Sequence, residues 1–297
     1  MKNKENFMEK IEGNIMIPDC EKLEQIKEKI KQEGVDKIHA LVDFDRTLTK
    51  AYVKGKERPS LISILRDGNY LTLDYAEKAH ALFDKYHPME IDVNLSIEEK
   101  KKAMREWWIN HFKLLIESGL NKKDLKRVVD SEGVEFREGA LEFIDRLNKA
   151  EIPLVIMSSS GLGGDSIAMF LKKQNRLYDN IHIISNVYIW DKNGNAISVK
   201  EPIIHNFNKD ETSIKNFPAF EIMKNRKNVL LLGDSLGDVG MIEGFDYDNL
   251  LKIGFLNEKI DESLEKYKEN FDVVILNDSD MDYVNDLLKN IVVLAQW

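Results

Sequence analysis

Two aspartates at the end of an apolar segment are the residues best suited to chemistry in this sequence. Asp43 and Asp45 directly follow the run Ile38–Val42, whose composition is typical of a buried strand. Residues two apart point to the same side of an extended chain, so both carboxylates could face one pocket. Like charges that close repel each other, and a cation or a shared proton would relieve the repulsion. The alternative is a solvated turn, where Asp is also common.

A second acid cluster ends another apolar segment late in the chain. The run Asn228–Leu232 leads into a Gly-bearing turn that carries Asp234 and Asp238. Two strand ends so far apart in sequence meet only where a sheet brings its carboxyl ends together, which is where open α/β sheets bind ligands. Clustered carboxylate oxygens suit a hard cation such as Mg²⁺. Asp234 alone could instead be a helix N-cap.

A set of short motifs accompanies these two clusters. They are DFDRTLT at 43–49, YVKGK at 52–56, EID at 90–92, IHNFNK at 204–209, LLGDS at 231–235 and LKIGFLN at 251–257. With them the chain resembles the haloacid-dehalogenase-like phosphohydrolases, and within that superfamily the cytosolic 5′-nucleotidase III (pyrimidine 5′-nucleotidase) family. The resemblance runs from about Leu23 to the C-terminus. Arg46 stands where family members more often have an apolar residue, and the Ser/Gly-rich loop at 160–164 is about two residues longer.

The resemblance implies hydrolysis of a phosphate monoester by a carboxylate nucleophile. Asp43 would attack phosphorus and form an aspartyl-phosphate, while Asp45 would act first as general acid and then as general base. Mg²⁺ would be held by Asp43, by the backbone carbonyl of Asp45 and by Asp234. Asp238 would lie behind these ligands and orient a metal-bound water or Lys209.

The resemblance also implies residues that bind the phosphate. Ser158, and next to it Ser159, would hold the phosphate where the Gly-rich loop opens a helix. Lys209 matches the lysine of the family and would pair with the phosphate. Lys200 is a competing candidate, and either lysine could simply be a surface residue.

Recognition of the nucleoside is expected from the segment between the first motif and Gly133. Glu90 matches the substrate-contacting glutamate of the family. His111 occupies a position where family members contact the base, and it could separate pyrimidine nucleotides from 7-methylguanosine monophosphate. Trp107 and Trp108 could stack on a base, but their helical spacing favours packing within a helical core.

The elements expected along the chain alternate between strand and helix. Strands are expected at 38–42, 153–157, 181–184, 229–232, 250–255 and 273–276, and a hairpin at 187–199. Helices are expected at 20–31, 138–149, 165–175, 212–225 and 261–268, and at the end of the chain. This alternation predicts an α/β fold with a doubly wound, mostly parallel, Rossmann-like sheet. The resemblance implies that this sheet is the haloacid-dehalogenase-like (HAD-like) core.

A block of helices interrupts that alternation after the first strand. Helices are expected at 74–86, 96–118 and 122–130, whereas 50–70 is expected to be loop and Pro88 is expected to break the first helix. We therefore predict a discontinuous core domain, 1–49 and 133–297, with an inserted α-helical cap domain, 50–132.

The composition limits the class of partner. The chain has 297 residues, of which 43% are hydrophobic and 32% charged, as in ordinary soluble proteins. A net charge of −9 argues against a nucleic acid polymer and leaves a small phosphorylated ligand. The single cysteine, Cys20, excludes an intramolecular disulfide and fits a reducing compartment. With no signal-like or membrane-spanning run, we expect a cytoplasmic monomer that does not bind membranes.

The function expected from these features is that of a Mg²⁺-dependent 5′-nucleotidase, which converts UMP and CMP to nucleoside and phosphate. Alternatives with the same chemistry are a 7-methylguanosine-monophosphate nucleotidase and a nucleoside phosphotransferase. An alternative from another class is a catalytically silent nucleotide-binding protein. The complete set of Asp43, Asp45, Lys209 and Asp234 argues against the silent protein, because binding alone requires no nucleophile beside a metal site.

Overall fold

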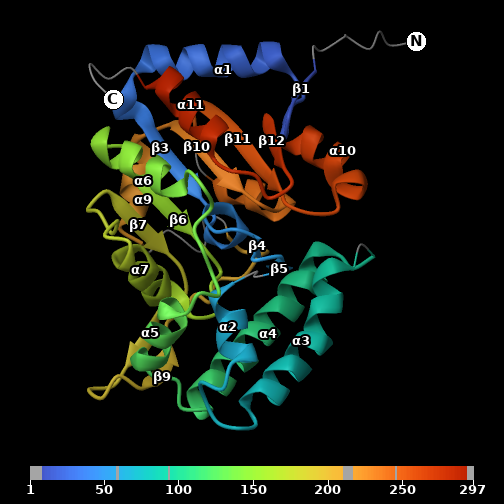
Figure 1. Ribbon diagram of the computed structural model, residues 1–297, viewed down its shortest axis with the longest axis vertical. Coiled ribbons are helices and arrows are strands. Elements are labelled where there is room, and N and C mark those ends of the chain that lie inside the picture. The colour runs from blue at the N-terminus through green and yellow to red at the C-terminus, as the bar shows by residue number, and fades with distance from the viewer. Residues whose placement is uncertain (1–8, 58–59, 93, 210–216, 245, 293–297) are drawn as a thin grey trace.

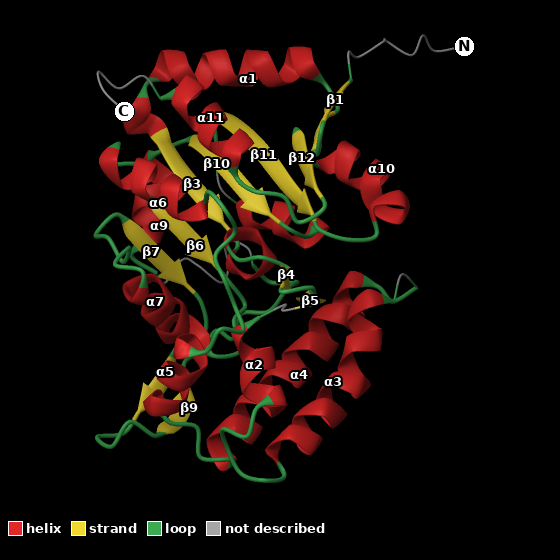
Figure 2. Ribbon diagram, in the orientation of Figure 1, coloured by secondary structure: helices red, strands yellow, loops and turns green. Residues whose placement is uncertain are grey.

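The fold is built on a central sheet. The computed structural model describes residues 9–57, 60–92, 94–209, 217–244 and 246–292. Over these residues one eight-stranded sheet has the order β1-β2-β12-β11-β10-β3-β6-β7 (Figures 1 and 2). Its strands are Lys10–Glu12 (β1), Ile15–Ile17 (β2), Ile38–Val42 (β3), Leu154–Met157 (β6), Ile181–Ile184 (β7), Asn228–Gly233 (β10), Asn249–Leu256 (β11) and Val273–Leu276 (β12).

The order of the strands places a ligand site between β3 and β10. All pairings from β12 to β7 are parallel, and the short edge strands β1 and β2 are antiparallel. The chain starts the parallel sheet at β3, adds β6 and β7 on one side, and then returns to add β10, β11 and β12 on the other. The strand order thus reverses between β3 and β10, and a crevice opens at the carboxyl ends of such neighbours. The predicted doubly wound, mostly parallel sheet is confirmed.

Two helical layers bury the faces of the sheet. Within β3, Ala40 and Val42 pack into one core cluster and Leu41 into the other, as alternation requires. The first cluster includes helices Cys20–Glu33 (α1), Ala140–Lys149 (α6), Gly163–Lys173 (α7) and Asp282–Ile291 (α11). The second includes Ala219–Asn225 (α9), Leu236–Ile242 (η3) and Ile260–Asn270 (α10). Because both faces are covered, the strands appear in the sequence as continuous apolar runs.

A separate group of helices lies beyond the carboxyl ends of the strands. These are Leu61–Asp67 (α2), Tyr75–Ile91 (α3), Ile97–Glu117 (α4) and Lys122–Asp130 (α5). Figure 2 shows α2, α3 and α4 packed together on the side toward which the strand arrows point. A capping box between Ser96 and Glu99 starts α4. All four helices fall within residues 50–132, and the division into core and cap domains stays a prediction.

Two hairpins complete the fold. Tyr52–Val53 (β4) pairs with Lys56–Glu57 (β5) where the chain leaves the sheet. Tyr188–Trp190 (β8) pairs with Ala196–Val199 (β9), which confirms the hairpin expected around Asn193-Gly194. None of the helices in the described part of the chain is long and apolar enough to cross a membrane.

Two predictions for the helical group are wrong. The segment 50–70 contains β4, β5 and the helix α2 instead of loop alone. Helix α2 is only seven residues long, and burial of Leu61 and Leu65 stabilises it, which periodicity cannot reveal. Helix α3 continues through Pro88 to Ile91, and the carbonyl of Pro88 still accepts the backbone N–H of Asp92 at 3.1 Å, so the helical hydrogen bonding persists past the proline. Of the helix predicted at 212–225, residues 212–216 lie outside the described residues.

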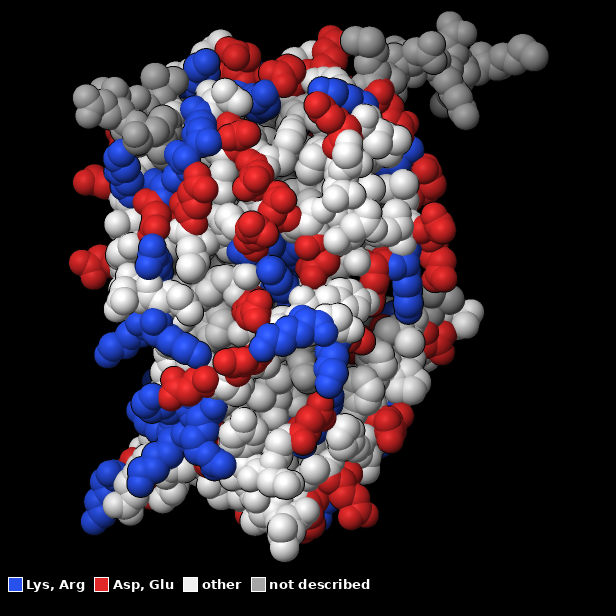
Figure 3. Space-filling model, in the orientation of Figure 1, with Lys and Arg blue, Asp and Glu red and all other residues white. Residues whose placement is uncertain are grey.

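The charged side chains are mixed on the face shown in Figure 3, apart from a basic group over α5. This helix carries Lys122, Lys123, Lys126 and Arg127. Arg127 pairs with Asp124 on the same helix at 3.1 Å, and Lys126 pairs with Asp130. Such internal pairing is typical of a solvated helix face.

Candidate active site

The turn after β3 holds the first acidic motif in a fixed shape. The backbone N–H of Asp43 donates to the carbonyl of Leu232 in β10 at 3.0 Å, so the turn begins at the junction of the two strands. Arg46 adopts a left-handed backbone with φ +62°, and its N–H donates to Thr49 Oγ1 at 2.9 Å. The buried guanidinium of Arg137 donates to the carbonyl of Thr47 at 2.8 Å. These contacts aim the Asp43 and Asp45 side chains past the strand end.

The predicted convergence of the two strand ends is present in the structure. Asp43, Asp234 and Asp238 each place a carboxylate oxygen within 4.8 Å of those of the other two. The buried ammonium of Lys209 pairs with Asp43 Oδ1, and with Asp238 Oδ1 at 3.1 Å. Four side chains from three distant parts of the sequence therefore form one charged cluster.

Burial and mutual repulsion shift the proton affinities of this cluster. Burial is the main cause that raises the pKa of Asp43 and of Asp234, and the charge of Asp238 raises both further. Burial lowers the pKa of Lys209, but the carboxylates of Asp238 and Asp43 outweigh this and raise it. The cluster therefore contains more negative charge than Lys209 can neutralise, a condition that favours binding of a cation.

Asp238 supports the cluster from behind. Its Oδ2 accepts the backbone N–H groups of Asp234 at 3.1 Å and Ser235 at 2.9 Å, and the Ser235 hydroxyl at 2.9 Å. A Cβ atom on Gly233 would lie 2.4 Å from that of Asp238, so this close approach requires glycine. With one oxygen so occupied and the other on Lys209, Asp238 is positioned to orient Asp234 and Lys209.

The donor set fits the magnesium ion that the sequence implies. The clustered ligand atoms are all carboxylate oxygens, which is the chemistry that Mg²⁺ prefers. Asp43 and Asp234 supply them from adjacent strands. The side chain of Asp45 is absent from this cluster, and its backbone carbonyl as a metal ligand stays a prediction.

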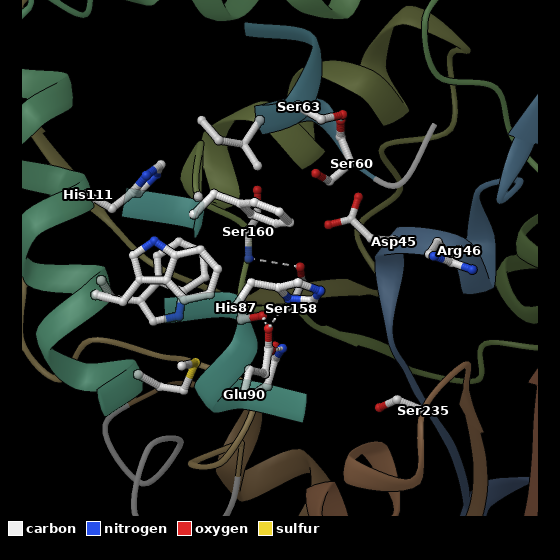
Figure 4. A pocket seen from close by; sticks show the side chains of 18 of the residues that line it. Asp45, Arg46, Ser60, Ser63, His87, Glu90, His111, Ser158, Ser160 and Ser235 are labelled. Atoms are coloured by element: carbon white, nitrogen blue, oxygen red, sulfur yellow. Dashed lines mark hydrogen bonds and ion pairs between the residues drawn. The ribbon is translucent and has the colours of Figure 1, made fainter. Parts of the chain in front are cut away.

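Asp45 lines the cavity separately from the carboxylate cluster. Figure 4 shows its carboxylate turned toward Ser60 and away from Arg46. Burial and the charge of Asp43 raise the pKa of Asp45 to about 8. Within the described residues its buried Oδ1 has no hydrogen-bond partner. A carboxyl group in this state is protonated near neutral pH and can donate to a ligand.

The loop after β6 borders the opposite side of the cavity. Ser158, Ser159 and Ser160 all line it. Ser158 Oγ accepts the N–H of Ser160 at 3.1 Å, and Ser159 Oγ donates to Asn206 Oδ1 at 2.7 Å. Gly163 starts α7 with φ +71°, where a Cβ atom would lie 2.6 Å from the Asn186 carbonyl oxygen, so only glycine fits. The serines are thus held at the helix start, where an anion is favoured.

The structure distinguishes the two candidate lysines. Lys209 is buried and lines the cavity among the acids. Lys200 is exposed at the end of the β8–β9 hairpin and is not among the cavity residues. Lys209 is therefore the lysine of this site.

Glu90 and His111 come from the cap helices and both line the cavity. One carboxylate oxygen of Glu90 accepts from Asn206, and the other lies 3.1 Å from His87 Nδ1. The ring of His111 lies against Gly161, where an added Cβ would be 2.8 Å from its Nε2. Burial lowers the pKa of His111 to about 4, so the imidazole is neutral at neutral pH. Glu90 thus connects the cap to the loop that leads to Lys209.

The tryptophans of α4 belong to an aromatic column. Trp107 stacks with Tyr86 at a centroid distance of 5.9 Å and with Trp108 at 6.3 Å, and Trp108 stacks with Phe112 at 5.6 Å. Both tryptophans also border the cavity. The two tryptophans therefore pack against other aromatic residues of the helical group, as their spacing indicated. They also form part of the cavity wall.

Most of the chain matches known nucleotidases. The model of the pyrimidine 5′-nucleotidase (UMPH-1) family matches residues 46–292. The chain belongs to this family. It is 32% identical over 281 residues to the chicken (Gallus gallus) 7-methylguanosine phosphate-specific 5′-nucleotidase, covering 94% of this chain and 96% of the relative. Its human (Homo sapiens) counterpart is 34% identical over 272 residues, covering 91% and 90%.

Solved structures agree with this assignment. Cytosolic 5′-nucleotidase IIIB bound to cytidine superimposes with a TM-score of 0.86 at 27% identity, over 94% of each chain. A phosphoserine phosphatase, as a phospho-aspartyl intermediate analogue, matches with a TM-score of 0.50 at 18% identity, over 84% of this chain and 97% of the other, and shows the shared fold. The predicted HAD-like core is confirmed, and this member of the pyrimidine 5′-nucleotidase family is a phosphoric monoester hydrolase.

Several residues that line the cavity of this nucleotidase were not predicted from the sequence. The cavity has a volume of about 370 Å³, within the range of small-molecule sites. Residues from the cap that line it without having been predicted are Ser60, Ser63, Arg66, Phe83 and His87. Asn206 lies inside the IHNFNK motif, which could have indicated it. Arg66 lies in the segment expected to be loop, and no sequence signal marks it.

Proposed function

We propose that this nucleotidase hydrolyses UMP and CMP to nucleoside and phosphate in a Mg²⁺-dependent reaction through an aspartyl-phosphate on Asp43. The supporting observation is a single cavity that has the acid cluster at one end and aromatic and polar cap residues at the other. A nucleoside monophosphate has the matching division into an anionic phosphate and a flat base. The cytosolic names of two related proteins support a cytosolic location.

Asp43 is the proposed nucleophile. Lys209 binds its Oδ1, which leaves the second carboxylate oxygen for attack on phosphorus. The attack forms the Asp43–phosphate bond and breaks the bond from phosphorus to the ester oxygen of the nucleoside. Mg²⁺, held by Asp43, Asp234 and the backbone carbonyl of Asp45, supplies neutralisation of the phosphoryl charge.

Asp45 is the proposed general acid and base. It starts protonated, in keeping with its raised pKa of about 8, and gives this proton to the leaving oxygen of the nucleoside. It then removes a proton from the water that hydrolyses the aspartyl-phosphate. The water oxygen bonds to phosphorus and the Asp43–phosphate bond breaks, so that free phosphate leaves and the proton taken from water leaves Asp45 protonated as at the start.

The remaining predicted residues bind the substrate. Ser158, Ser159 and Lys209 lie around the acid end of the cavity and hold the phosphoryl oxygens. Glu90 and His111 lie on the cap side and contact the nucleoside. This arrangement positions the ester bond between Asp43 and Asp45.

A second candidate substrate is 7-methylguanosine monophosphate. The names of relatives at 32% to 34% identity favour it. Both candidates require the same reaction at the phosphate and differ only in the base, so the cap side of the cavity decides between them.

Phosphate release from a panel of nucleotides tests the proposed function. UMP, CMP, dTMP, AMP, GMP and 7-methyl-GMP are assayed with Mg²⁺ and with chelator, and added nucleoside acceptors report any phosphotransfer. We expect Mg²⁺-dependent release that is fastest with UMP and CMP. Preference for 7-methyl-GMP would show that this nucleotide, and not UMP or CMP, is the substrate. If phosphate is released from none of them, the remaining alternative is a catalytically silent nucleotide-binding protein.

The variant Asp43→Asn tests the nucleophile. Because an amide cannot form the acyl-phosphate, we expect kcat to fall by about 10⁴-fold or more. Circular dichroism and the melting temperature should show an intact fold, since Lys209 keeps its contact with Asp238. Turnover comparable to that of the unaltered enzyme would contradict the assignment.

A further inference from the structure

Arg66 places a positive charge on the cap wall of the cavity. It belongs to α2, lines the cavity, and has a side chain only 21% exposed. Its guanidinium carbon lies 4.9 Å from the ring centroid of Phe83, another residue of the wall. Arginine remains charged at any physiological pH. A nucleoside in this part of the cavity therefore meets a permanent cation.

The charge of Arg66 is only weakly neutralised by its neighbours. Its ion pair joins Nε to Asp67 Oδ1 at 3.5 Å, and the Asp67 side chain is 51% exposed and also faces His80 at 3.5 Å. In the described part of the chain no residue accepts a hydrogen bond from the two terminal nitrogens of Arg66. An exposed, shared carboxylate screens such a cation poorly from a ligand inside the cavity.

Two features that would attract a cationic base, Glu90 and Phe83, are already engaged. Glu90 has one oxygen on Asn206 and the other beside His87 Nδ1. The ring of Phe83 stacks with His87 at a centroid distance of 4.6 Å and has Arg66 nearby. Both the carboxylate and this aromatic surface thus already contact nitrogen-bearing groups, which leaves less attraction for a further cation.

The candidate substrates differ in the charge of the base. Methylation at N7 gives guanine a formal positive charge, whereas uracil, cytosine and unmodified guanine are neutral at neutral pH. A half-buried like charge on the wall penalises the cationic base and leaves the neutral ones unaffected.

We propose that Arg66 is a specificity-determining residue that excludes nucleotides with a cationic base, so that the substrates of this enzyme are nucleoside monophosphates with neutral bases. This deepens the proposed function and rests on it for the reaction at the phosphate. Under this proposal the chain differs in substrate from the relatives named for 7-methylguanosine phosphate.

GMP and 7-methyl-GMP form the matched pair that tests the proposal, because they differ only by the methyl group and its charge. Values of kcat and KM are measured for the unaltered enzyme, Arg66→Gln and Arg66→Lys. Arg105→Gln is the control, since Arg105 is an exposed arginine of α4 outside the cavity. We expect Arg66→Gln to raise the ratio of kcat/KM for 7-methyl-GMP to that for GMP by about tenfold. The change should lie mostly in KM, because repulsion acts on the bound base throughout the reaction.

The remaining outcomes also decide the question. Arg66→Lys and Arg105→Gln should leave the ratio unchanged, since each keeps the charge on the cavity wall. An unchanged ratio in folded Arg66→Gln, or an equal rise in Arg66→Lys, overturns the proposal while the proposed function stands. If no nucleotide is hydrolysed, the proposed function fails; calorimetric binding of guanosine and 7-methylguanosine to the same variants then gives the ratio without turnover.

Discussion

At the scale of single residues, Arg46 is the positively charged residue of the first motif that reaches an acid of the site. Its guanidinium pairs with Glu258 Oε1 at 2.8 Å and Glu57 Oε1 at 3.4 Å, and its Nε lies 3.6 Å from Asp234 Oδ2. The side chain of Arg46 therefore reaches the carboxylate proposed to bind Mg²⁺. A positive charge at this distance weakens the attraction for a divalent cation.

Replacement of Arg46 by Met should strengthen the binding of Mg²⁺. We expect a dissociation constant lower by roughly 3- to 10-fold, because the change removes about 1 kcal/mol of repulsion. Calorimetric titration with Mg²⁺ alone measures this directly, and the Mg²⁺ dependence of activity should shift in parallel. Arg46→Lys keeps the charge and is the control. Unchanged or weaker binding in Arg46→Met would show that Arg46 does not oppose the ion.

At the scale of elements, the buried strands carry polar groups that make stability depend on pH. His39 lies in β3 and is 2% exposed, with Nδ1 2.6 Å from the carbonyl oxygen of Arg226. Burial lowers the pKa of His39 to about 4, whereas a histidine in an unfolded chain titrates near 6.5. Between these two pKa values His39 is protonated in the unfolded chain and neutral in the folded one. Through this residue, acid therefore shifts the equilibrium toward unfolding.

The contribution of His39 to the free energy of unfolding should therefore fall as the pH drops from about 6.5 toward 4, while the raised pKa values of the buried Asp43 and Asp45 act in the opposite direction. The contribution of His39 is about 1.4 kcal/mol per pH unit and roughly 3 kcal/mol in total, and the buried His111 adds to the slope. Urea unfolding at pH 7, 6 and 5 measures it. His39→Gln should lower the slope of the free energy of unfolding against pH, and His80→Gln, at an exposed position, should leave this slope unchanged. Equal slopes in the His39 variant and the unaltered protein would contradict the argument.

At the scale of the whole molecule, an ion pair and two backbone hydrogen bonds connect the sheet with the segment that leads to the cap. The side chain of Arg137 is fully buried and pairs with Asp278 Oδ1 at 3.1 Å. Asp278 also accepts the backbone N–H groups of Ala51 at 2.9 Å and Tyr52 at 3.0 Å. The loop after β12 is thereby joined to the chain just as it leaves the first motif.

Asp278→Ala should remove these interactions and destabilise the protein. Arg137 would lose its carboxylate and two backbone N–H groups would lose their acceptor, so we expect a loss of roughly 3 kcal/mol in the free energy of unfolding. Chemical denaturation measures it, and proteolysis near Ala51 should become faster. Asp280→Ala, at an exposed acid two residues away, should cost less than about 1 kcal/mol. Equal stability of the two variants would remove the structural role assigned to Asp278.

The sequence by itself determined the features that depend on local pattern. Alternating strands and helices indicated the parallel sheet, and two apolar runs ending in acids placed Asp43 and Asp234 at one edge. Both follow from short-range rules, since a buried strand must be apolar and its carboxyl end must face the crevice. The edge strands β1 and β2 and the helix α2 are too short for such a pattern.

Only the tertiary structure decided which side chains meet inside the cavity. Lys209 rather than Lys200 lies between Asp43 and Asp238, and Glu90 reaches Asn206, 116 residues away. Arg66 enters the cavity because burial of its neighbours folds α2 against the cap. Contacts across such separations arise from the packing of one element on another, and no periodicity along the chain encodes them.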